Sequence, residues 1–302
     1  MRNSTIRITV IIPTYNRPDS IIRCINSILA QTHQPNEIII VDDNSTDDTI
    51  NQIKSIPSSL IRIIELGRNH GAQFARNRGI EAATSEWIAF LDSDDEWLPF
   101  KLERQIDLLE LNGYSKDIVI HGNCYRHNDM TKAKTKWELN MTEGQEAYKQ
   151  LLLYPGPMFQ AMLIPKIKLE EIGLLDENVP SYQEWDTAIM LSKICKYIHI
   201  QEPIFIYHIH DGETISKNKG NDIRGYAFIV EKNMNDMGLQ ALSHHYSTLL
   251  TKSFQYGEWS SAIYYLQKIY GFPLLIWTKV ILVRLRLHPS CIKYYLKRFI
   301  YR

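Results

Sequence analysis

The sequence predicts an α/β protein with a mostly parallel central sheet, and three observations support that prediction. Over the first 120 residues, short apolar runs rich in Ile and Val alternate with segments whose apolar residues recur at helical spacing. Alternation of this kind is typical of parallel sheets, because two parallel strands need a crossover connection. Polar residues that could bind a ligand or take part in catalysis lie where the predicted strands end. That edge is where open α/β sheets bind ligands.

The predicted strands and helices of this first part follow one another in regular order. The strands are Ile8–Ile12, Glu37–Val41, Ile61–Leu66, Trp87–Leu91 and Asp117–His121. The helices begin after Asp19 or Ser20, at Ser45, at Ala72 and at Pro99, and the last of them ends at Asn112-Gly113. Asp48 lies three residues after Ser45, which is the spacing of a capping box.

The pattern is less regular after residue 120. Asn123–Lys136 is polar and predicts a loop or a hairpin, while Gln145–Leu153 predicts a helix. Met158–Ile164 and Ile198–Tyr207 have the composition of strands, and the pattern is helical from about Asp222 onward. We therefore expect one domain over residues 1–220, with halves at 1–120 and 121–220, and a helical C-terminal region over 221–302.

Charge is balanced over the whole chain but unevenly placed. The formal net charge of the 302 residues is zero, yet residues 279–302 hold seven Lys and Arg and no acid, with aromatic residues between them. A basic helix rich in aromatic residues can lie in an anionic membrane interface, which is the interpretation we prefer. The alternative is a C-terminal helix packed on the domain with a solvated basic face. Only this tail favours a nucleic-acid partner, and we expect none.

The remaining composition indicates a cytoplasmic protein. Cys24, Cys124, Cys195 and Cys291 are scattered and show no metal-site or disulfide spacing, which fits a reducing compartment. No run of 18 apolar residues is present, so we expect any membrane contact to be peripheral, on the cytoplasmic face of the inner membrane.

An acidic cluster follows the fourth predicted strand. Asp92, Asp94, Asp95 and Glu96 lie within five residues, and crowded carboxylates repel one another unless a cation lies between them. Oxygen ligands of this kind suit Mg²⁺ or Mn²⁺. A solvated acidic turn is the alternative for the cluster taken alone. The first strand is followed by neither a dinucleotide fingerprint nor a P-loop, so phosphates would have to be bound through a metal and arginines.

Four motifs in register resemble the family 2 glycosyltransferases, which have a GT-A fold. They are Val10-Ile11-Ile12-Pro13-Thr14-Tyr15-Asn16, Ile40-Val41-Asp42-Asp43-Asn44-Ser45-Thr46-Asp47, Ala75-Arg76-Asn77-Arg78-Gly79 and Phe90-Leu91-Asp92-Ser93-Asp94. The clear resemblance covers about residues 6–120, with weaker matches to about residue 216. It implies an inverting transfer of a sugar from a nucleotide diphosphate to a hydroxyl, usually with Mn²⁺ or Mg²⁺.

The resemblance also implies where the donor and the metal are bound. The nucleotide sugar would contact Pro13, Thr14, Tyr15, Arg17, Asp42, Asn44, Arg76 and Asp92. Asp92 and Asp94 form the DxD pair, with Asp94 the more direct metal ligand. His210 is a second candidate ligand, and the alternative for it is a hydrogen-bonded structural histidine at a strand end. We expect uridine as the base and a UDP-hexose as the donor. Without the resemblance, Asp42 and Asn44 would be interpreted as turn residues.

A motif later in the sequence indicates which residues would bind and activate the acceptor. Family members carry an acidic pair followed by Trp-Asp, and this chain has Gln183-Glu184-Trp185-Asp186. Glu184 matches the catalytic base, while Gln183 replaces the usual first acid. Trp185 and Asp186 are candidate contacts to a saccharide or lipid-linked acceptor in surface polysaccharide synthesis. The alternative for Glu184 and Asp186 is a pair of acids favoured by the helix dipole.

Other functions remain open at this point. A catalytically silent nucleotide-sugar-binding module would share the donor motifs but is disfavoured by the intact Asp92, Asp94 and Glu184. A sugar nucleotidyltransferase would need a glycine-rich basic loop after the first strand, and Pro13–Asp19 is not such a loop.

Overall fold

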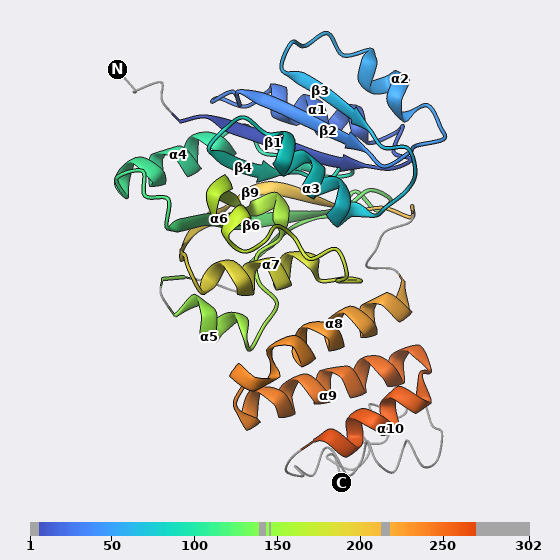
Figure 1. Cartoon of the computed structure of the whole chain (residues 1–302). Coiled ribbons are helices and arrows are strands. Elements are labelled where there is room, and N and C mark those ends of the chain that lie inside the picture. Colours follow the sequence, from blue (N-terminus) through green and yellow to red (C-terminus); the bar gives the residue numbers. More distant parts are fainter. Residues whose placement is uncertain (1–5, 139–142, 145, 213–217, 270–302) are drawn as a thin grey trace. The chain divides into compact units, whose positions relative to one another are not determined.

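The computed structural model describes residues 6–138, 143–144, 146–212 and 218–269 (Figure 1). The chain divides into two compact units. One comprises Met1–Asn178 and Gln183–Gly212, and the other comprises Val179–Tyr182 and Glu213–Arg302.

The first unit is built on a mixed sheet, which has nine strands among the described residues. Its strands are β1 (Ile8–Thr14), β2 (Glu37–Asp42), β3 (Ile61–Glu65), β4 (Trp87–Phe90), β5 (Glu96–Trp97), β6 (Ile118–Asn128), β7 (Lys134–Trp137), β8 (Leu163–Pro165) and β9 (Lys196–Ile209). The order is β3-β2-β1-β4-β8-β6-β9-β5, with β7 paired to β6. Strands β3, β2, β1 and β4 are parallel, whereas β8 runs antiparallel to both β4 and β6.

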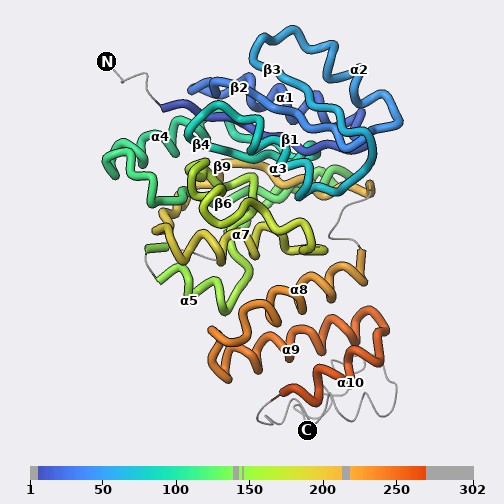
Figure 2. The backbone as a smooth tube through the Cα atoms, in the orientation of Figure 1, coloured from blue at the N-terminus to red at the C-terminus, as the bar shows by residue number. Residues whose placement is uncertain are grey.

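Short helices connect and flank these strands, as the backbone trace shows (Figure 2). They are α1 (Ile21–Leu29), α2 (Thr49–Lys54), α3 (Ala72–Ala82), α4 (Lys101–Leu111), α5 (Ala147–Leu151), the 3-10 helix η1 (Phe159–Ala161), α6 (Lys166–Glu171) and α7 (Gln183–Ser192). The α/β fold with a mostly parallel sheet is thereby confirmed.

The core has two faces because side chains alternate along a strand. Ile8, Val10 and Ile12 of β1 join a buried cluster that includes Ile25 of α1 and Leu102 of α4. Helix α3 instead packs against β1 and β2 (Figure 1). A Cβ placed at Gly79 would lie 2.5 Å from Cγ2 of Ile11, so only glycine lets α3 approach the strand this closely.

Several local predictions differ from the structure. The helix expected at Ser45 begins at Thr49, because Asp47 Oδ1 accepts the Thr49 backbone N–H (3.0 Å) and Ser45 serves a turn. Residues expected to form one strand over Met158–Ile164 form η1 and then β8. The polar segment Asn123–Lys136 takes the hairpin alternative, with β7 antiparallel to β6.

The second unit is helical where it is described. It contains α8 (Lys219–Asn233), η3 (Met234–Asp236), α9 (Leu239–Tyr256) and α10 (Trp259–Lys268). Buried Asp222 organises it by accepting hydrogen bonds from Tyr182 (2.5 Å), Lys252 (2.7 Å) and Tyr256 (2.7 Å).

No helix within the described residues is long and apolar enough to cross a bilayer. The basic tail, residues 279–302 with Cys291, lies outside the described residues. The other three cysteines are buried free thiols.

Candidate active site

Two predicted donor-binding residues lie side by side at the carboxyl ends of β1 and β2. Thr14 and Asp42 are paired in register and are both buried. Asp42 Oδ2 accepts the Ser45 backbone N–H at 2.9 Å, which closes the turn after β2. Asp42 Oδ1 and Thr14 Oγ1 are buried without a hydrogen-bond partner in the described part of the chain. Buried polar atoms are almost always paired, so these two atoms are available to a polar ligand.

The loops after β1 and β2 are tied to each other. Asn16, in the left-handed region at φ 50°, donates its backbone N–H to Ser45 Oγ (2.9 Å) and accepts the Thr46 N–H on Oδ1 (2.9 Å). The Arg17 backbone N–H donates to Thr49 Oγ1 at 2.8 Å.

The other loop residues predicted to contact the nucleotide sugar differ in their exposure to solvent. Pro13 is buried in β1, Tyr15 is 42% exposed, and Asn44 is exposed in a left-handed conformation at φ 69°. Neighbouring Asp43 has a structural role, since its two oxygens accept the backbone N–H groups of His70 and Gly71 ahead of α3.

Arg76 of α3 is the buried centre of the site. Its Nη2 donates to Asp92 Oδ1 at 2.6 Å, and its Nη1 donates to Gln73 and to Gln183 at 3.0 and 3.1 Å. The guanidinium lies 4.5 Å above the centre of the Phe159 ring. A planar guanidinium with several donors is suited to holding elements in fixed relation. Arg76 thus links α3, the end of β4 and the start of α7.

Asp92 and Asp95 share one amide donor. Gln160 Nε2 donates to Asp92 Oδ2 at 2.8 Å and to Asp95 Oδ2 at 2.6 Å. Burial raises the pKa of Asp95 well above its usual range, and the charges of Asp94 and Asp92 raise it further. The acidic cluster is therefore divided, with Asp95 inside the fold and Asp92 partly exposed.

Asp94 and His210 form a close pair at the partly exposed side of the cluster. His210 Nε2 lies 3.0 Å from Asp94 Oδ2, and Arg17 Nε lies 3.6 Å from the same oxygen. Burial alone would raise the pKa of Asp94, but the His210 hydrogen bond and the Arg17 charge outweigh it and lower that pKa. Asp94 is therefore an ionised carboxylate at neutral pH.

Asp94 and His210 are spaced as two ligands of a divalent metal would be, while Asp92 does not join them in a close three-ligand group within the described residues. Neighbouring ligands of an octahedral ion with bonds of about 2.1 Å lie about 3 Å apart, which matches the separation of Asp94 and His210. Mn²⁺ accepts imidazole as well as carboxylate. Asp92 stays a candidate ligand, since each of its oxygens keeps a lone pair beyond its bonds to Arg76 and Gln160.

Glu184 lies in the first turn of α7, where the charges of Arg76 and Asp92 act on it. Burial raises the pKa of Glu184, the Arg76 charge acts against that increase, and the Asp92 charge adds to it. Its side chain is nevertheless partly exposed. A carboxyl with a raised pKa at a partly open site is suited to accept a proton near neutral pH.

The two residues after Glu184 are more enclosed. Trp185 is fully buried and donates its indole N–H to the Leu151 carbonyl at 2.8 Å, and Asp186 is 3% exposed. Direct contact with an acceptor would require either side chain to become uncovered, so their acceptor role stays a prediction.

Some participants were not identified from the sequence. Gln160 donates to Asp92, and Gln73 accepts from Arg76. No sequence motif marks either glutamine, because Gln160 is distant in sequence from Asp92 and the spacing of Gln73 and Arg76 is unremarkable. Gln183 was noted as a departure from the family motif. The structure shows what it does: its side-chain oxygen accepts from Arg76.

The chain resembles known glycosyltransferases in sequence and in structure. The model of "Glycosyl transferase family 2" matches residues 9–172. The Escherichia coli UDP-Glc:alpha-D-GlcNAc-diphosphoundecaprenol beta-1,3-glucosyltransferase WfaP is 31% identical over 222 residues, which are 72% of this chain and 82% of that protein. The succinoglycan biosynthesis protein ExoO of Rhizobium meliloti is 43% identical over 106 residues, 35% of this chain and 30% of ExoO.

A solved structure shares the fold at low sequence identity. S. aureus TarS 1-349 in complex with UDP-GlcNAc superposes with a TM-score of 0.67 at 18% identity, covering 88% of this chain and 82% of that one. Its likeness supports the GT-A fold. With the family model matching more than half of the 302 residues, the chain belongs to glycosyl transferase family 2, and it is a glycosyltransferase of GT-A fold.

Proposed function

We propose that the protein transfers a hexose from a UDP-sugar, with inversion at the anomeric carbon, to a hydroxyl of a saccharide or lipid-linked acceptor in surface polysaccharide synthesis. The observation that carries the proposal is the position of Glu184. Burial raises the pKa of Glu184, and the charges of Arg76 and Asp92 act on it in opposite directions. Asp92 accepts a hydrogen bond from Arg76 and precedes Asp94 of the Asp94–His210 pair by two residues. A base and a diphosphate site are the two groups that an inverting displacement needs.

The donor end of the site supports a nucleotide. The unpaired Asp42 Oδ1 can accept an N–H from the base, and the Thr14 hydroxyl can donate to a base carbonyl or accept from the ribose. The two buried oxygen atoms offer an acceptor and a donor, which suits a uracil edge with its N–H beside a carbonyl. Tyr15 is exposed enough to cover the base, while Pro13 and Asn44 shape the loops around it.

Charged side chains and a metal ion would bind the diphosphate of the nucleotide sugar. Arg17 is close enough to Asp94 to neutralise a phosphate bound there, and Arg76 orients Asp92. Asp94 and His210, with Asp92, would hold Mn²⁺ or Mg²⁺. That ion, when bound, stabilises the negative charge of the departing diphosphate.

Glu184 would act on the acceptor. Its ionised carboxylate takes the proton of the acceptor hydroxyl as the oxygen forms a bond to the anomeric carbon. The bond from that carbon to the diphosphate oxygen breaks in the same step, and the nucleoside diphosphate leaves with the electron pair. Attack from the face opposite the leaving group inverts the configuration. General-base catalysis of this kind contributes about 10²–10⁴-fold to a rate.

The acceptor class rests on the relatives. WfaP is named for a UDP-glucose donor and a diphosphoundecaprenol-linked acceptor, and ExoO is named for succinoglycan biosynthesis. A lipid-linked acceptor would suit action at the cytoplasmic face of the inner membrane, which the basic residues of 279–302 would favour.

A thermal-shift panel of UDP-, GDP-, CDP- and dTDP-sugars, with and without Mn²⁺, tests the donor proposal. We expect one UDP-hexose to raise the melting temperature in a metal-dependent way, because a ligand of the folded state stabilises it by linkage. Asp94→Asn should lose the metal dependence. Equal responses to all four nucleotides, or none, would contradict the proposed donor class.

A further inference from the structure

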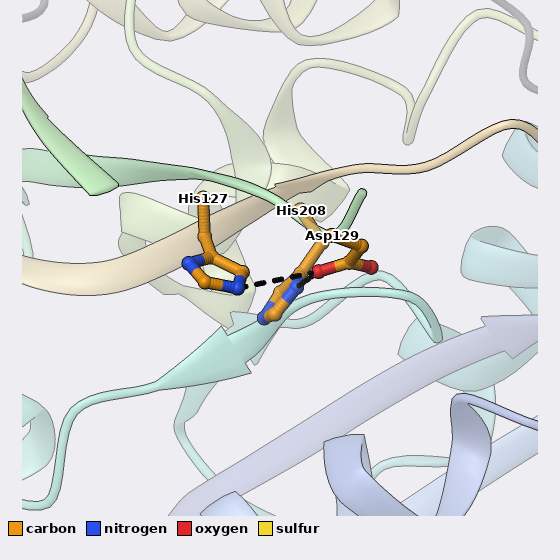
Figure 3. A group of neighbouring side chains, drawn as sticks. All are labelled: His127, Asp129 and His208. Atoms are coloured by element: carbon orange, nitrogen blue, oxygen red, sulfur yellow. Dashed lines mark hydrogen bonds and ion pairs between the residues drawn. The ribbon is translucent and has the colours of Figure 1, made fainter. Parts of the chain in front are cut away.

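A second group of metal-ligating side chains lies where β6 and β9 run side by side. His127 of β6 and His208 of β9 are direct cross-strand partners, and Asp129 follows β6 at the start of its hairpin turn. Their rings and carboxylate converge on one point (Figure 3). One ligand atom from each residue lies within 4.8 Å of the other two. None of the three was singled out as a site residue by sequence motifs.

Two distances among these atoms lie on either side of the ligand separation around a bound ion. His208 Nδ1 is 2.6 Å from Asp129 Oδ1, and His127 Nε2 is 3.6 Å from the same oxygen. Ligands of a tetrahedral ion with bonds of about 2.0–2.1 Å lie about 3.3 Å apart. Asp129 is partly exposed and lies in a turn, so sub-ångström shifts of one side chain would bring the set to that spacing.

The second nitrogen of His208 is already oriented as it is in metal centres. Nε2 lies 2.6 Å from Glu96 Oε1. A neutral imidazole has one N–H, so donation from Nε2 to Glu96 leaves the lone pair of Nδ1 facing Asp129. Metal-ligating histidines usually donate their other N–H to a carboxylate in this way, which fixes the ring and its tautomer.

The competing arrangement is an ion-pair cluster without metal. A doubly protonated His208 could donate to Glu96 and Asp129 at once, with Arg23 beside both acids at 3.4 and 4.0 Å. That arrangement uses both ring nitrogens of His208, while His127 has a 3.6 Å contact with Asp129 and an edge-on ring contact with His208. A metal ion would use all three side chains as ligands.

We propose that His127, Asp129 and His208 form a divalent-metal site, supported by Glu96 and built from side chains other than those of the Asp94–His210 pair. Two imidazole nitrogens and one carboxylate oxygen suit a borderline transition metal such as Zn²⁺. The ion would fasten the β6–β7 hairpin to β9. Through Glu96 it would also reach β5, the strand that follows the DxD pair.

Cobalt binding to the full-length, tag-free chain tests this site independently of catalysis. The background is the Asp94→Asn/His210→Ala double variant, which lacks the proposed catalytic ligands. After chelation and dialysis, we expect it to bind one equivalent of Co²⁺ with the visible absorption of a four- or five-coordinate ion, and Zn²⁺ should displace that absorption. Adding His127→Ala should abolish the signal, and Asp129→Asn should do the same.

Two further variants sharpen the test. Glu96→Gln should keep the stoichiometry but weaken Zn²⁺ binding about 10–100-fold, the usual effect of losing a supporting carboxylate. His199→Gln changes another partly buried β9 histidine, one whose ring contacts Asn123, and should leave Co²⁺ binding unchanged. Circular dichroism in chelator checks that each variant is folded.

The proposal is overturned by either of two results. One is Co²⁺ binding by the double variant without visible absorption, which would indicate only aqueous-like surface binding. The other is the same binding with and without His127→Ala, which would leave the ion-pair cluster as the correct description. Neither result bears on sugar transfer, because the background variant already lacks the catalytic pair.

Discussion

Individual side chains of the proposed site offer different atoms to the fold and to a ligand. Asp42 gives one oxygen to the turn after β2 and leaves the other unpaired, so turn chemistry and ligand binding are compatible functions of one carboxylate. Thr14 is the simpler case, since its hydroxyl has no partner within the described residues and is buried. Its contribution to binding can therefore be measured apart from stability.

Thr14→Val should weaken donor binding without weakening the fold. A valine has the same shape, and the hydroxyl it removes makes no bond in the described residues, so the free energy of unfolding should stay the same or rise. Loss of one hydrogen bond of about 0.5–1.5 kcal/mol corresponds to a rise in the UDP-sugar Kd of about 2–13-fold. Calorimetric titration and urea unfolding measure the two effects.

Thr9→Val is the matched control on the same strand. The Thr9 hydroxyl donates to Glu37 Oε1 at 2.6 Å, so its loss should lower the free energy of unfolding by about 1 kcal/mol and leave the Kd unchanged. The reverse pattern in the two variants would show that Thr14 has no part in donor recognition.

Glu184→Gln should stop turnover and spare donor binding. Loss of a general base lowers the rate by about 10²–10⁴-fold. In the unaltered enzyme the rate should increase with pH through a pKa above the usual glutamate value, since the base must be ionised. Single-turnover assays across pH with the preferred donor measure both. Persistent turnover in this variant would remove Glu184 from the mechanism.

The same variant should be more stable at neutral pH. A raised pKa means that the fold disfavours the ionised form of Glu184, so the ionised side chain costs stability above its ordinary pKa. Below that ordinary pKa the carboxyl is neutral in both the folded and the unfolded state, and the difference between Glu184 and Gln disappears. Urea midpoints measured at pH 7.5 and at pH 4 would show this convergence.

At the scale of elements, close packing places the site residues. Helix α3 lies against β1 because Gly79 has no Cβ to meet Ile11, and Arg76 lies one turn earlier on that helix. The position of Arg76 relative to the strand ends therefore depends on a contact at the middle of β1.

Gly79→Ala should destabilise the protein through overpacking. The added Cβ would lie 2.5 Å from Cγ2 of Ile11, so the helix or the strand must shift, at a cost of about 1–3 kcal/mol. The shift should also weaken donor binding through Arg76. Gly67→Ala is the control, because nothing lies within 4 Å of a Cβ there. Equal urea midpoints for the two variants would contradict this account of α3.

Local patterns predicted the elements well and their long-range pairing poorly. The first four strands follow from runs of β-branched residues, and helices α1, α3 and α4 from spacing and caps. The antiparallel β8 was not predicted, because strand direction depends on contacts distant in sequence. The start of α2 was misplaced because Ser45 Oγ accepts the Asn16 backbone N–H of the neighbouring loop, and Asp48 takes the N-cap position instead.

Motifs at strand ends predicted candidate residues, and some of them are neighbours in the structure. Arg76 donates to Asp92, and the charges of both act on Glu184, while their roles in binding and catalysis stay predictions. The group formed by His127, Asp129 and His208 was not predictable, since its members come from strands about 80 residues apart with no shared motif.

At the scale of the whole molecule, the chain combines a catalytic unit with a helical unit that carries a basic end. The full-length protein should bind vesicles containing anionic lipid and not neutral ones, with affinity falling as salt rises. Lys293→Glu/Lys297→Glu/Arg298→Glu removes three of the seven basic residues of 279–302, which should weaken binding by about 10²-fold or more. Co-sedimentation at two salt concentrations measures this. Unchanged binding by the triple variant would favour a solvated basic face instead.

The ties between the loops after β1 and β2 have a consequence for the thermodynamics of recognition. Asn16 joins them through two hydrogen bonds and Arg17 through a third, so the loops are ordered before any nucleotide arrives. Ordering of loops is one of the entropic costs of association, and a preformed edge avoids most of it. Nucleotide capture should therefore resemble lock-and-key association, with a rate set by diffusion and charge rather than by loop closure.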